Sequence, residues 1–223
     1  MVIILLETIE WKISNTPIEY DFAISEMQKR VTNIKSNTNN ELVWLLEHES
    51  IFTAGTSARD EDLINSQVKT RHTGRGGQWT WHGPGQRVAY VMLNLKKRLP
   101  DIKAYVNALE EWIILTLEDF NIVGVRLENK PGVWVANKNK SYDKIAALGV
   151  RISSWVSWHG ISININPNLE EFKNIIPCGI NDGGVTSLYN LNRKITFEEF
   201  DFKLNKNFLF IFGDKSLFKL NKD

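Results

Sequence analysis

Apolar residues recur at steps of three and four in three segments of the chain, a period typical of helices with one buried face. The first predicted helix covers residues 16–35, where Thr16, Pro17 and Glu19 resemble an N-cap, a first-turn proline and a capping-box acid. The second covers residues 101–120 with Asp101 as its expected N-cap, and the third covers residues 196–213. The buried stripe of the second helix is predicted to be Ile102, Tyr105, Val106, Leu109, Trp112, Ile113, Leu117 and Phe120.

Short apolar runs between these helices predict strands. They are an N-terminal strand within residues 1–11 and further strands at residues 42–47, 132–137, 144–153 and 158–166. In the last of them Ile161, Ile163 and Ile165 alternate with polar residues, which predicts a strand with one buried face. Helices mixed with strands that fold back on one another indicate an α+β or mixed α/β fold. The 223 residues show no internal repeat and no long linker, so residues 1–223 are expected to form a single domain.

Composition narrows the class of protein. The hydrophobic fraction of 43% and the charged fraction of 24% are ordinary for a globular protein. A formal net charge of +1 provides no bulk attraction to nucleic acid or to a membrane surface, so neither partner is expected. The N-terminal apolar run lacks the features of a signal peptide, and no apolar stretch has the length of a membrane span. We therefore expect a cytoplasmic protein.

The single cysteine, Cys178, lies in the stretch "NIIPCGI". A lone cysteine is most often a small buried hydrophobe, and it rules out a disulfide within the chain. Here Pro177 fixes its own backbone and Gly179 permits close approach of another group. This placement predicts a shaped turn, and Cys178 becomes a candidate for chemistry if another residue activates its thiol.

Residues 73–95, "TGRGGQWTWHGPGQRVAYVMLNL", are rich in glycine. Glycines allow backbone N–H groups to face a ligand, Arg75 adds a fork of donors, and Trp79 and Trp81 offer flat apolar walls. The spacing matches neither a dinucleotide fingerprint nor a P-loop. From the pattern alone, a ligand-binding loop and a glycine-rich hairpin corner are equally good interpretations.

Two further residues carry possible chemistry. Lys144 begins an apolar strand, where it either extends its ammonium to solvent or is held inside a site. His159 lies beside a strand, and a structural histidine is the simpler interpretation. The four histidines, His48, His72, His82 and His159, show no spacing typical of metal ligands, so no metal site is expected.

Three motifs in this order resemble the octanoyltransferases of protein lipoylation. They are "RGGQWTWHGPGQRVAY", "KIAALGVRISSWVSWHGISININ" and "IIPCGI", preceded by "LEHESIFTAGTSA", and the likeness covers about residues 40 to 190. The chain departs from the family at two positions: Trp81 replaces the common Tyr or Phe, and Trp158 replaces the common Thr. Both changes are expected in the pocket wall, where they bear on the preferred acyl length.

The resemblance implies the fold of biotin–protein and lipoate ligases, a mixed sheet flanked by helices. It implies an acyltransferase that moves an octanoyl or lipoyl group from acyl carrier protein to a lysine ε-amine, the first step of endogenous protein lipoylation. The acceptors would be lipoyl domains of 2-oxoacid dehydrogenases and the glycine-cleavage H protein. Cys178 would be the nucleophile that forms a thioester and Lys144 its base, with no cofactor. A monomer is expected.

The resemblance also implies a substrate groove made from two of the motifs. Its residues would be Arg75, Gly76, Gly77, Gln78, Trp79, Thr80, Trp81, His82, Ala147, Leu148, Gly149, Gly160, Ile161 and Ser162. An adjacent ammonium lowers the pKa of a thiol, ordinarily about 8.5, which makes the Cys–Lys pairing chemically sensible. Two alternatives stay open: a lipoate ligase on the same scaffold that activates its acid with ATP, and a non-catalytic module that binds acylated proteins.

Overall fold

The computed structural model describes residues 2–6, 9–176 and 184–213, with side-chain burial from residue 9 onward. Its helices are α1 (Tyr20–Lys35), α2 (Ile102–Glu118) and α3 (Phe197–Phe212), with short 3-10 turns η1 (Asp60–Asp62), η2 (Leu95–Lys97) and η3 (Leu169–Asn174). Its strands are β1 (Val2–Leu6), β2 (Ile9–Ile13), β3 (Glu41–Leu46), β4 (Ile51–Ala54), β5 (Thr70–His72), β6 (Trp79–His82), β7 (Gln86–Met92), β8 (Gly124–Leu127), β9 (Lys130–Ala136), β10 (Tyr142–Ser153), β11 (Val156–Asn164) and β12 (Gly184–Val185).

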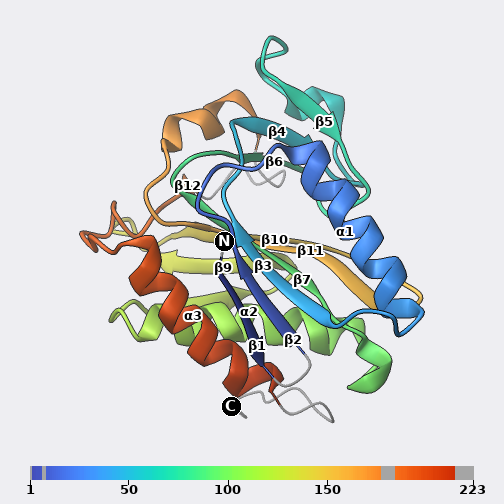
Figure 1. Cartoon of the computed structure of the whole chain (residues 1–223). Helices are drawn as coiled ribbons and strands as arrows, with labels where there is room; N and C mark the ends of the chain where they lie inside the picture. The colour runs from blue at the N-terminus through green and yellow to red at the C-terminus, as the bar shows by residue number, and fades with distance from the viewer. Residues whose placement is uncertain (1, 7–8, 177–183, 214–223) are drawn as a thin grey trace.

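Within the described residues the strands form one large mixed sheet and one small sheet (Figure 1). The large sheet has the order β1-β2-β3-β7-β11-β10-β9-β8, and β12 pairs with β10. Its pairs β2–β3 and β10–β12 are parallel, and the remaining pairs are antiparallel. The small sheet has the order β5-β4-β6. The predicted mixed sheet flanked by helices is therefore confirmed.

The two faces of the large sheet are covered by different elements. On one face α2 and α3 pack together, where Trp112 and Phe208 meet with ring centroids 5.2 Å apart. On the other face α1 lies along the sheet and buries Met27 and Val31 against Trp44 and other strand residues (Figure 1). The small sheet lies next to the N-terminal end of α1, where Arg71 of β5 pairs with Asp21 (Figure 1). A sheet buried on both sides needs apolar residues on both faces, which the strands supply.

Strand β11 was predicted to have one buried face, but it is buried on both faces because the sheet is covered on both sides. All nine of its residues are buried, although only alternate positions are apolar. Ile161 and Ile163 face the core beneath α2 and α3, whereas Ser162 and Asn164 face the opposite side of the sheet, beneath the small sheet. The polar positions of β11 are therefore not solvated but line an interior site.

The helix starts were predicted with mixed success. Asp101 is the N-cap of α2, as expected, and accepts a hydrogen bond from the Ala104 amide at 3.0 Å. The N-cap of α1 is Glu19, three residues after the predicted Thr16, because Ile18 forms a bridge with His48 and keeps the preceding chain extended. Ile102 is 49% exposed, so its place in the buried stripe of α2 was wrong. The N-terminal strand is likewise two antiparallel strands, β1 and β2.

None of the helices that the structure describes has the length and apolar content to cross a lipid bilayer.

Candidate active site

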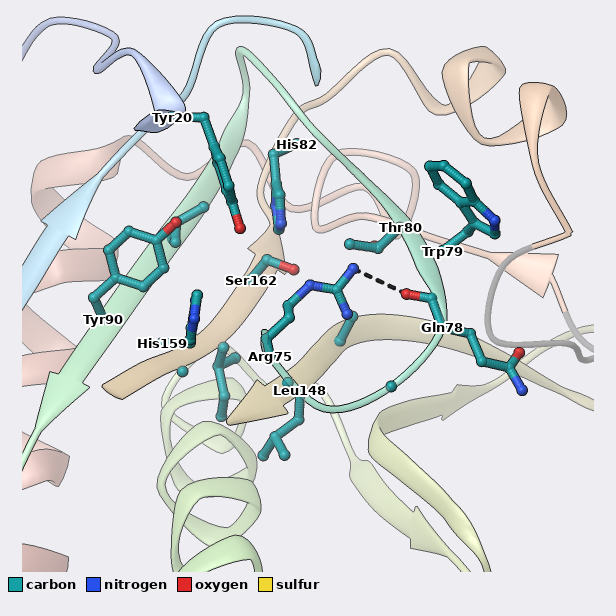
Figure 2. Close-up of a pocket in the computed structure, with 16 residues that line it drawn as sticks. Tyr20, Arg75, Gln78, Trp79, Thr80, His82, Tyr90, Leu148, His159 and Ser162 are labelled. Carbon is teal, nitrogen blue, oxygen red and sulfur yellow. Dashed lines mark hydrogen bonds between the residues drawn. The ribbon is translucent and has the colours of Figure 1, made fainter. Parts of the chain in front are cut away.

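A pocket lies between the large sheet and the glycine-rich segment (Figure 2). Its floor is formed by β10 and β11, and its cover by residues 75–82. The predicted groove residues all line it except Gly76 and Trp81. The sequence motifs thus converge in space: residues 75–82 and 147–149 are far apart in the chain but face each other across one cavity.

Trp81 and Trp158 both differ from the expectation that they form the pocket wall. Side chains alternate along β6, so Trp81 points away from the cavity and packs edge-on against Phe172 at 5.6 Å. Trp158 lies behind the wall, where its ring stacks on His159 with centroids 4.7 Å apart. Gly76 instead donates its amide to the Val150 carbonyl at 3.0 Å. Trp158 therefore contacts the pocket-lining residue His159 without lining the pocket itself.

Arg75 holds the glycine-rich loop in shape. Its guanidinium donates to the Thr53 carbonyl at 2.7 Å, to the Gln78 carbonyl at 2.9 Å and to the Gly76 carbonyl at 3.0 Å. Arg75 is buried, and charge-assisted hydrogen bonds of this kind are stronger than neutral ones. Its cation lies in the pocket wall while its donors fix the loop that covers the pocket (Figure 2).

Gly160 has a role that the sequence did not indicate. A Cβ atom at this position would lie 2.0 Å from the Ala89 carbonyl oxygen on β7. Such a contact is impossible, so glycine is required for β7 and β11 to pair at this register. Gly160 also lines the pocket, to which it contributes no side chain.

Lys144 reaches the pocket side of the sheet through a β-bulge. The pairing of β10 with β9 shifts between Lys144 and Ala146, and Ile145 and Ala146 are both buried in the core beneath α2 and α3. Two successive residues on one side reverse the alternation of the strand. As a result Lys144 shares the face of Ala147, whereas regular alternation would have directed it into the apolar core.

Polar and aromatic groups surround the Lys144 ammonium. It donates to the Pro131 carbonyl at 3.1 Å and lies 4.6 Å from the ring centroid of Trp134. Glu110 is nearby: burial raises the pKa of its carboxyl, and the Gly132 amide, Arg126 and Lys144 oppose that rise. Lys144 is 8% exposed, so its cation is held within the protein and not in solvent.

Cys178 lies outside the described residues, but the segments on both sides of it are anchored. On one side Ile176 donates its amide to the Asp62 carbonyl at 2.8 Å. On the other side Gly184 and Val185 pair directly with Asp143 and Lys144. The chain that carries Cys178 therefore returns to the sheet beside Lys144.

Two buried histidines support the pocket: His82, which was predicted in the groove, and His48, to which the sequence assigned no role. His48 Nδ1 lies 2.7 Å from the Ile18 carbonyl, which can only accept, so Nδ1 carries the proton. Burial lowers the pKa of His48 to about 4, so the neutral ring accepts at Nε2 from the Tyr90 hydroxyl at 2.6 Å. Because the Tyr90 hydroxyl donates its hydrogen to His48, its oxygen can still accept a hydrogen bond from a group in the pocket.

The second histidine begins a chain of hydrogen bonds that ends beside Lys144. His82 Nδ1 donates to Gln86 Oε1 at 2.7 Å, and Gln86 donates to Asn164 at 2.9 Å. Asn164 donates to the Thr186 carbonyl at 2.9 Å, and the Thr186 amide donates to the Lys144 carbonyl at 3.0 Å. Burial lowers the pKa of His82 well below its ordinary value, so the ring is neutral and its Nε2 accepts. This chain connects the cover of the pocket with its floor.

Across the ranges that the structure describes, no three His, Cys, Asp or Glu side chains gather in a way that could hold a metal ion.

Residues 19–209 match the family described as the lipoyl protein ligase A/B catalytic domain. Relatives named octanoyltransferase include one from Nitrobacter hamburgensis, 50% identical over 95% of this chain and 90% of its own length. Another, from Rhodopseudomonas palustris strain BisB5, is 52% identical over 92% of this chain and 82% of its own length.

Solved structures share the fold at low sequence identity. A bipartite lipoate protein ligase of Thermoplasma acidophilum, studied with its E2 lipoyl domain, has a TM-score of 0.67 at 10% identity and covers 95% of this chain and 85% of its own. Lipoate-protein ligase A bound with ATP has a TM-score of 0.65 at 11% identity, with coverage of 94% and 87%. A biotin protein ligase from Aquifex aeolicus has a TM-score of 0.52 at 18% identity, with coverage of 90% and 68%. The predicted ligase-like fold is confirmed.

Proposed function

Because the chain belongs to the octanoyltransferases within the lipoyl protein ligase A/B catalytic-domain family, we propose that it transfers octanoyl groups through a thioester on Cys178. The chain is an acyltransferase of protein lipoylation. The proposed donor is octanoyl-acyl carrier protein, and the proposed acceptor is the ε-amine of a lysine on a lipoyl domain or on the glycine-cleavage H protein. No nucleotide takes part.

The placement of Lys144 is the observation that carries this proposal. The bulge at Ile145 turns Lys144 to the pocket face, and Val185, at the end of the segment that follows Cys178, pairs with Lys144. A cation in this position lowers the pKa of a neighbouring thiol and increases its thiolate fraction at neutral pH. A lysine on the solvated end of a strand would have no such effect.

The chemistry balances without a co-substrate. The Cys178 thiolate attacks the donor's thioester carbonyl, a new C–S bond forms, and the donor's C–S bond breaks to release the carrier thiolate, which takes the proton of the Lys144 ammonium and leaves Lys144 neutral. The acceptor amine then attacks the acyl-Cys178 carbonyl, an amide forms, and the Cys178 thiol is released. Lys144 accepts the proton that the amine loses and returns it to the departing sulfur. The first step exchanges one thioester for another, and the second is downhill because an amide is more stable than a thioester.

The residues that line the pocket are suited to bind the acyl chain. Val88 and Ala147 give the acyl chain apolar contact, while Gly77 and Gly149 leave backbone close to the substrate. Backbone N–H groups in such a loop stabilise the oxyanion of each tetrahedral intermediate. Gly149 and Gly160 face each other across the strand pair of the floor, where neither contributes a side chain to the cavity.

One experiment separates this function from its alternatives. Purified protein is mixed with octanoyl-acyl carrier protein and an apo lipoyl domain, first without ATP and then with free octanoate plus ATP, and the mass of the lipoyl domain is followed. Octanoylation of the lipoyl domain without ATP is expected. Modification only with free acid and ATP would establish a ligase, and binding without modification would establish a non-catalytic module.

A further inference from the structure

The peptide that joins Pro131 to Gly132 is hydrogen-bonded to an ionisable side chain at each of its two ends. Its carbonyl, from Pro131, accepts from the Lys144 ammonium at 3.1 Å. Its N–H, from Gly132, donates to Glu110 Oε1 at 2.9 Å. In a trans peptide the carbonyl and the N–H point in opposite directions, so the two side chains bind opposite edges of one rigid plane. The orientation of this plane therefore decides where the acceptor of Lys144 lies.

The same peptide departs from the regular ladder of the sheet. The pairing of β8 with β9 shifts register between the β9 positions Trp134 and Lys130, and Pro131 and Gly132 lie inside this interval. Neither of the two has a partner in the described register of β9 with β10. Pro131 has no N–H to donate, and Gly132 has a φ of 118°, outside the range of a strand. Since the ladder does not hold this peptide, another group must fix it, and Glu110 is placed to do so.

Glu110 is a buried carboxylate on α2, with 5% of its surface exposed. Burying a carboxylate is unfavourable unless its oxygens are paired. Its Oε2 lies 3.4 Å from Arg126 Nε, and its Oε1 accepts the Gly132 amide. Arg126 also pairs with the adjacent carboxylate of Glu111, which is buried as well. Pairing with Arg126 therefore does not by itself require Glu110, whereas the bond to Gly132 does.

We propose that Glu110 is a positioning residue that fixes the Pro131–Gly132 peptide and, through the Pro131 carbonyl, holds the Lys144 ammonium in place for the reaction. This inference rests on the proposed function. Glu110 lies outside the pocket, so it acts through the peptide and not on the substrate. If the peptide rotates, its carbonyl leaves Lys144 and the ammonium is no longer held in one position. Small displacements of a reacting group are enough to slow a reaction markedly.

Three substitutions of Glu110 separate its hydrogen bond from its charge. Glu110→Gln removes the charge and keeps an oxygen that can accept from the Gly132 amide. Glu110→Met has a similar shape and removes both the charge and the acceptor. Glu110→Asp keeps a carboxylate on the side of Arg126 but is shorter by one methylene group, which withdraws its oxygens from Gly132. Glu111→Met is the matched control, because it removes a buried partner of Arg126 from the same turn of α2.

The kinetics of octanoyl transfer give the first readout. The value of kcat should fall about tenfold in Glu110→Met and Glu110→Asp, the effect of about one hydrogen bond to a charged group. The KM for the donor should stay within about twofold, since the residues that line the pocket are unchanged. Glu110→Gln and Glu111→Met should keep kcat within about threefold of wild type, because both retain an acceptor for the Gly132 amide.

The reactivity of Cys178 gives a second readout that general loosening of the fold would not reproduce. Glu110→Met should raise the pH midpoint of iodoacetamide alkylation by about half a unit in the wild-type background, because the cation is displaced. In the Lys144→Met background the same substitution should leave the midpoint unchanged, since Glu110 acts through Lys144. A purely structural role would change the midpoint equally in both backgrounds.

Urea unfolding verifies that each variant is folded, and the comparison of Glu110→Asp with Glu110→Gln decides the question if Glu110→Met is not. Equal losses of kcat in the acceptor-deficient variants and Glu110→Gln, or equal midpoint shifts in the two backgrounds, would overturn the inference while octanoyl transfer stands. Absence of octanoyl transfer in wild type would overturn the proposed function and the inference together.

Discussion

The Lys144 ammonium lies 4.6 Å from the centroid of the Trp134 ring, the residue opposite it on β9. A lysine over an aromatic face is attracted by the ring's electron-rich surface, which keeps its charge inside the protein. The bulge at Ile145 shifts the register of β10 so that Lys144 pairs with Trp134 and lies on the same side of the sheet. The position of the cation is thus set by backbone register, and the predictions below follow from it.

Replacement of Lys144 by methionine should make Cys178 less reactive at neutral pH. Removal of the cation should raise the pH midpoint of iodoacetamide alkylation of Cys178 by about one unit or more, the usual effect of one neighbouring charge. Alkylation is followed by intact mass between pH 6 and 10. Lys138→Met, at an exposed turn on the same hairpin, is the control. A midpoint that is equal in Lys144→Met and wild type would separate Lys144 from the thiol.

Gly132→Ala should damage the bulge. Gly132 has a φ of 118°, and an added Cβ would lie 2.5 Å from the Ala146 carbonyl oxygen. Backbone strain of this kind costs of order 1–3 kcal/mol, so the free energy of unfolding in urea should fall by about 2 kcal/mol and transfer activity should fall with it. Asn129→Gly, at a left-handed position of the same hairpin, should be tolerated. Full activity and stability in Gly132→Ala would show that the bulge is not required.

Ala147→Phe should block the pocket without unfolding the protein. Ala147 lies in the pocket floor and is partly exposed, so a phenyl ring can occupy the space proposed for the acyl chain. The value of kcat/KM for octanoyl transfer is expected to fall at least about a hundredfold, since displaced substrates lose their reactive geometry. Ala136→Phe, at an exposed position of β9, carries the same change away from the pocket. Equal loss in both variants would mean that the effect is on folding and not on the pocket.

Stability should decrease as pH falls below 6.5. Burial lowers the pKa of His48 to about 4 and that of His159 to about 3, so the unfolded chain binds these protons first. Each histidine therefore contributes its full stability above pH 6.5. As the pH falls, the free energy of unfolding decreases, by about 1.4 kcal/mol for each histidine at pH 5.5. Asp201 acts in the opposite direction, because burial, opposed by Arg87, raises its pKa to about 6.

Urea unfolding at pH 7.5 and pH 5.5 checks this pH dependence. His48→Gln should lose about 1.4 kcal/mol less than wild type between the two values, because it has one fewer buried histidine to protonate. His72→Gln, at an exposed position on β5, should lose as much as wild type. An identical loss in wild type and His48→Gln would show that His48 is not kept neutral by the fold.

The fold and the groove could be predicted because their signals are local. Helical periodicity located α2 and its Asp101 cap, and the motifs at residues 75–82 and 147–149 identified two sides of one pocket. Their juxtaposition depends on pairing between distant strands, which a single sequence does not report. Ile18, for example, is kept extended by its bridge to His48, a contact thirty residues away that delays the start of α1.

The residues that were missed are those whose role comes from long-range packing. Tyr20 lies on a helix face that alone indicates an ordinary core position, and Tyr90 occurs in an apolar strand. His159 was interpreted as a structural histidine, because nothing in "SWHGIS" indicates that both ring nitrogens would be unpaired. Nor does the run "KIAALG" reveal the bulge at Ile145, since all of its neighbours suit a regular strand.

Intact-mass measurement of the protein after incubation with octanoyl-acyl carrier protein alone tests the central claim most directly. Donor and intermediate are both thioesters, so the acyl-enzyme should accumulate when no acceptor is present. The mass should increase by one octanoyl group without ATP, hydroxylamine should remove that group, and Cys178→Ala should not acquire it. An adduct that requires ATP, or that forms equally on Cys178→Ala, would contradict transfer through Cys178.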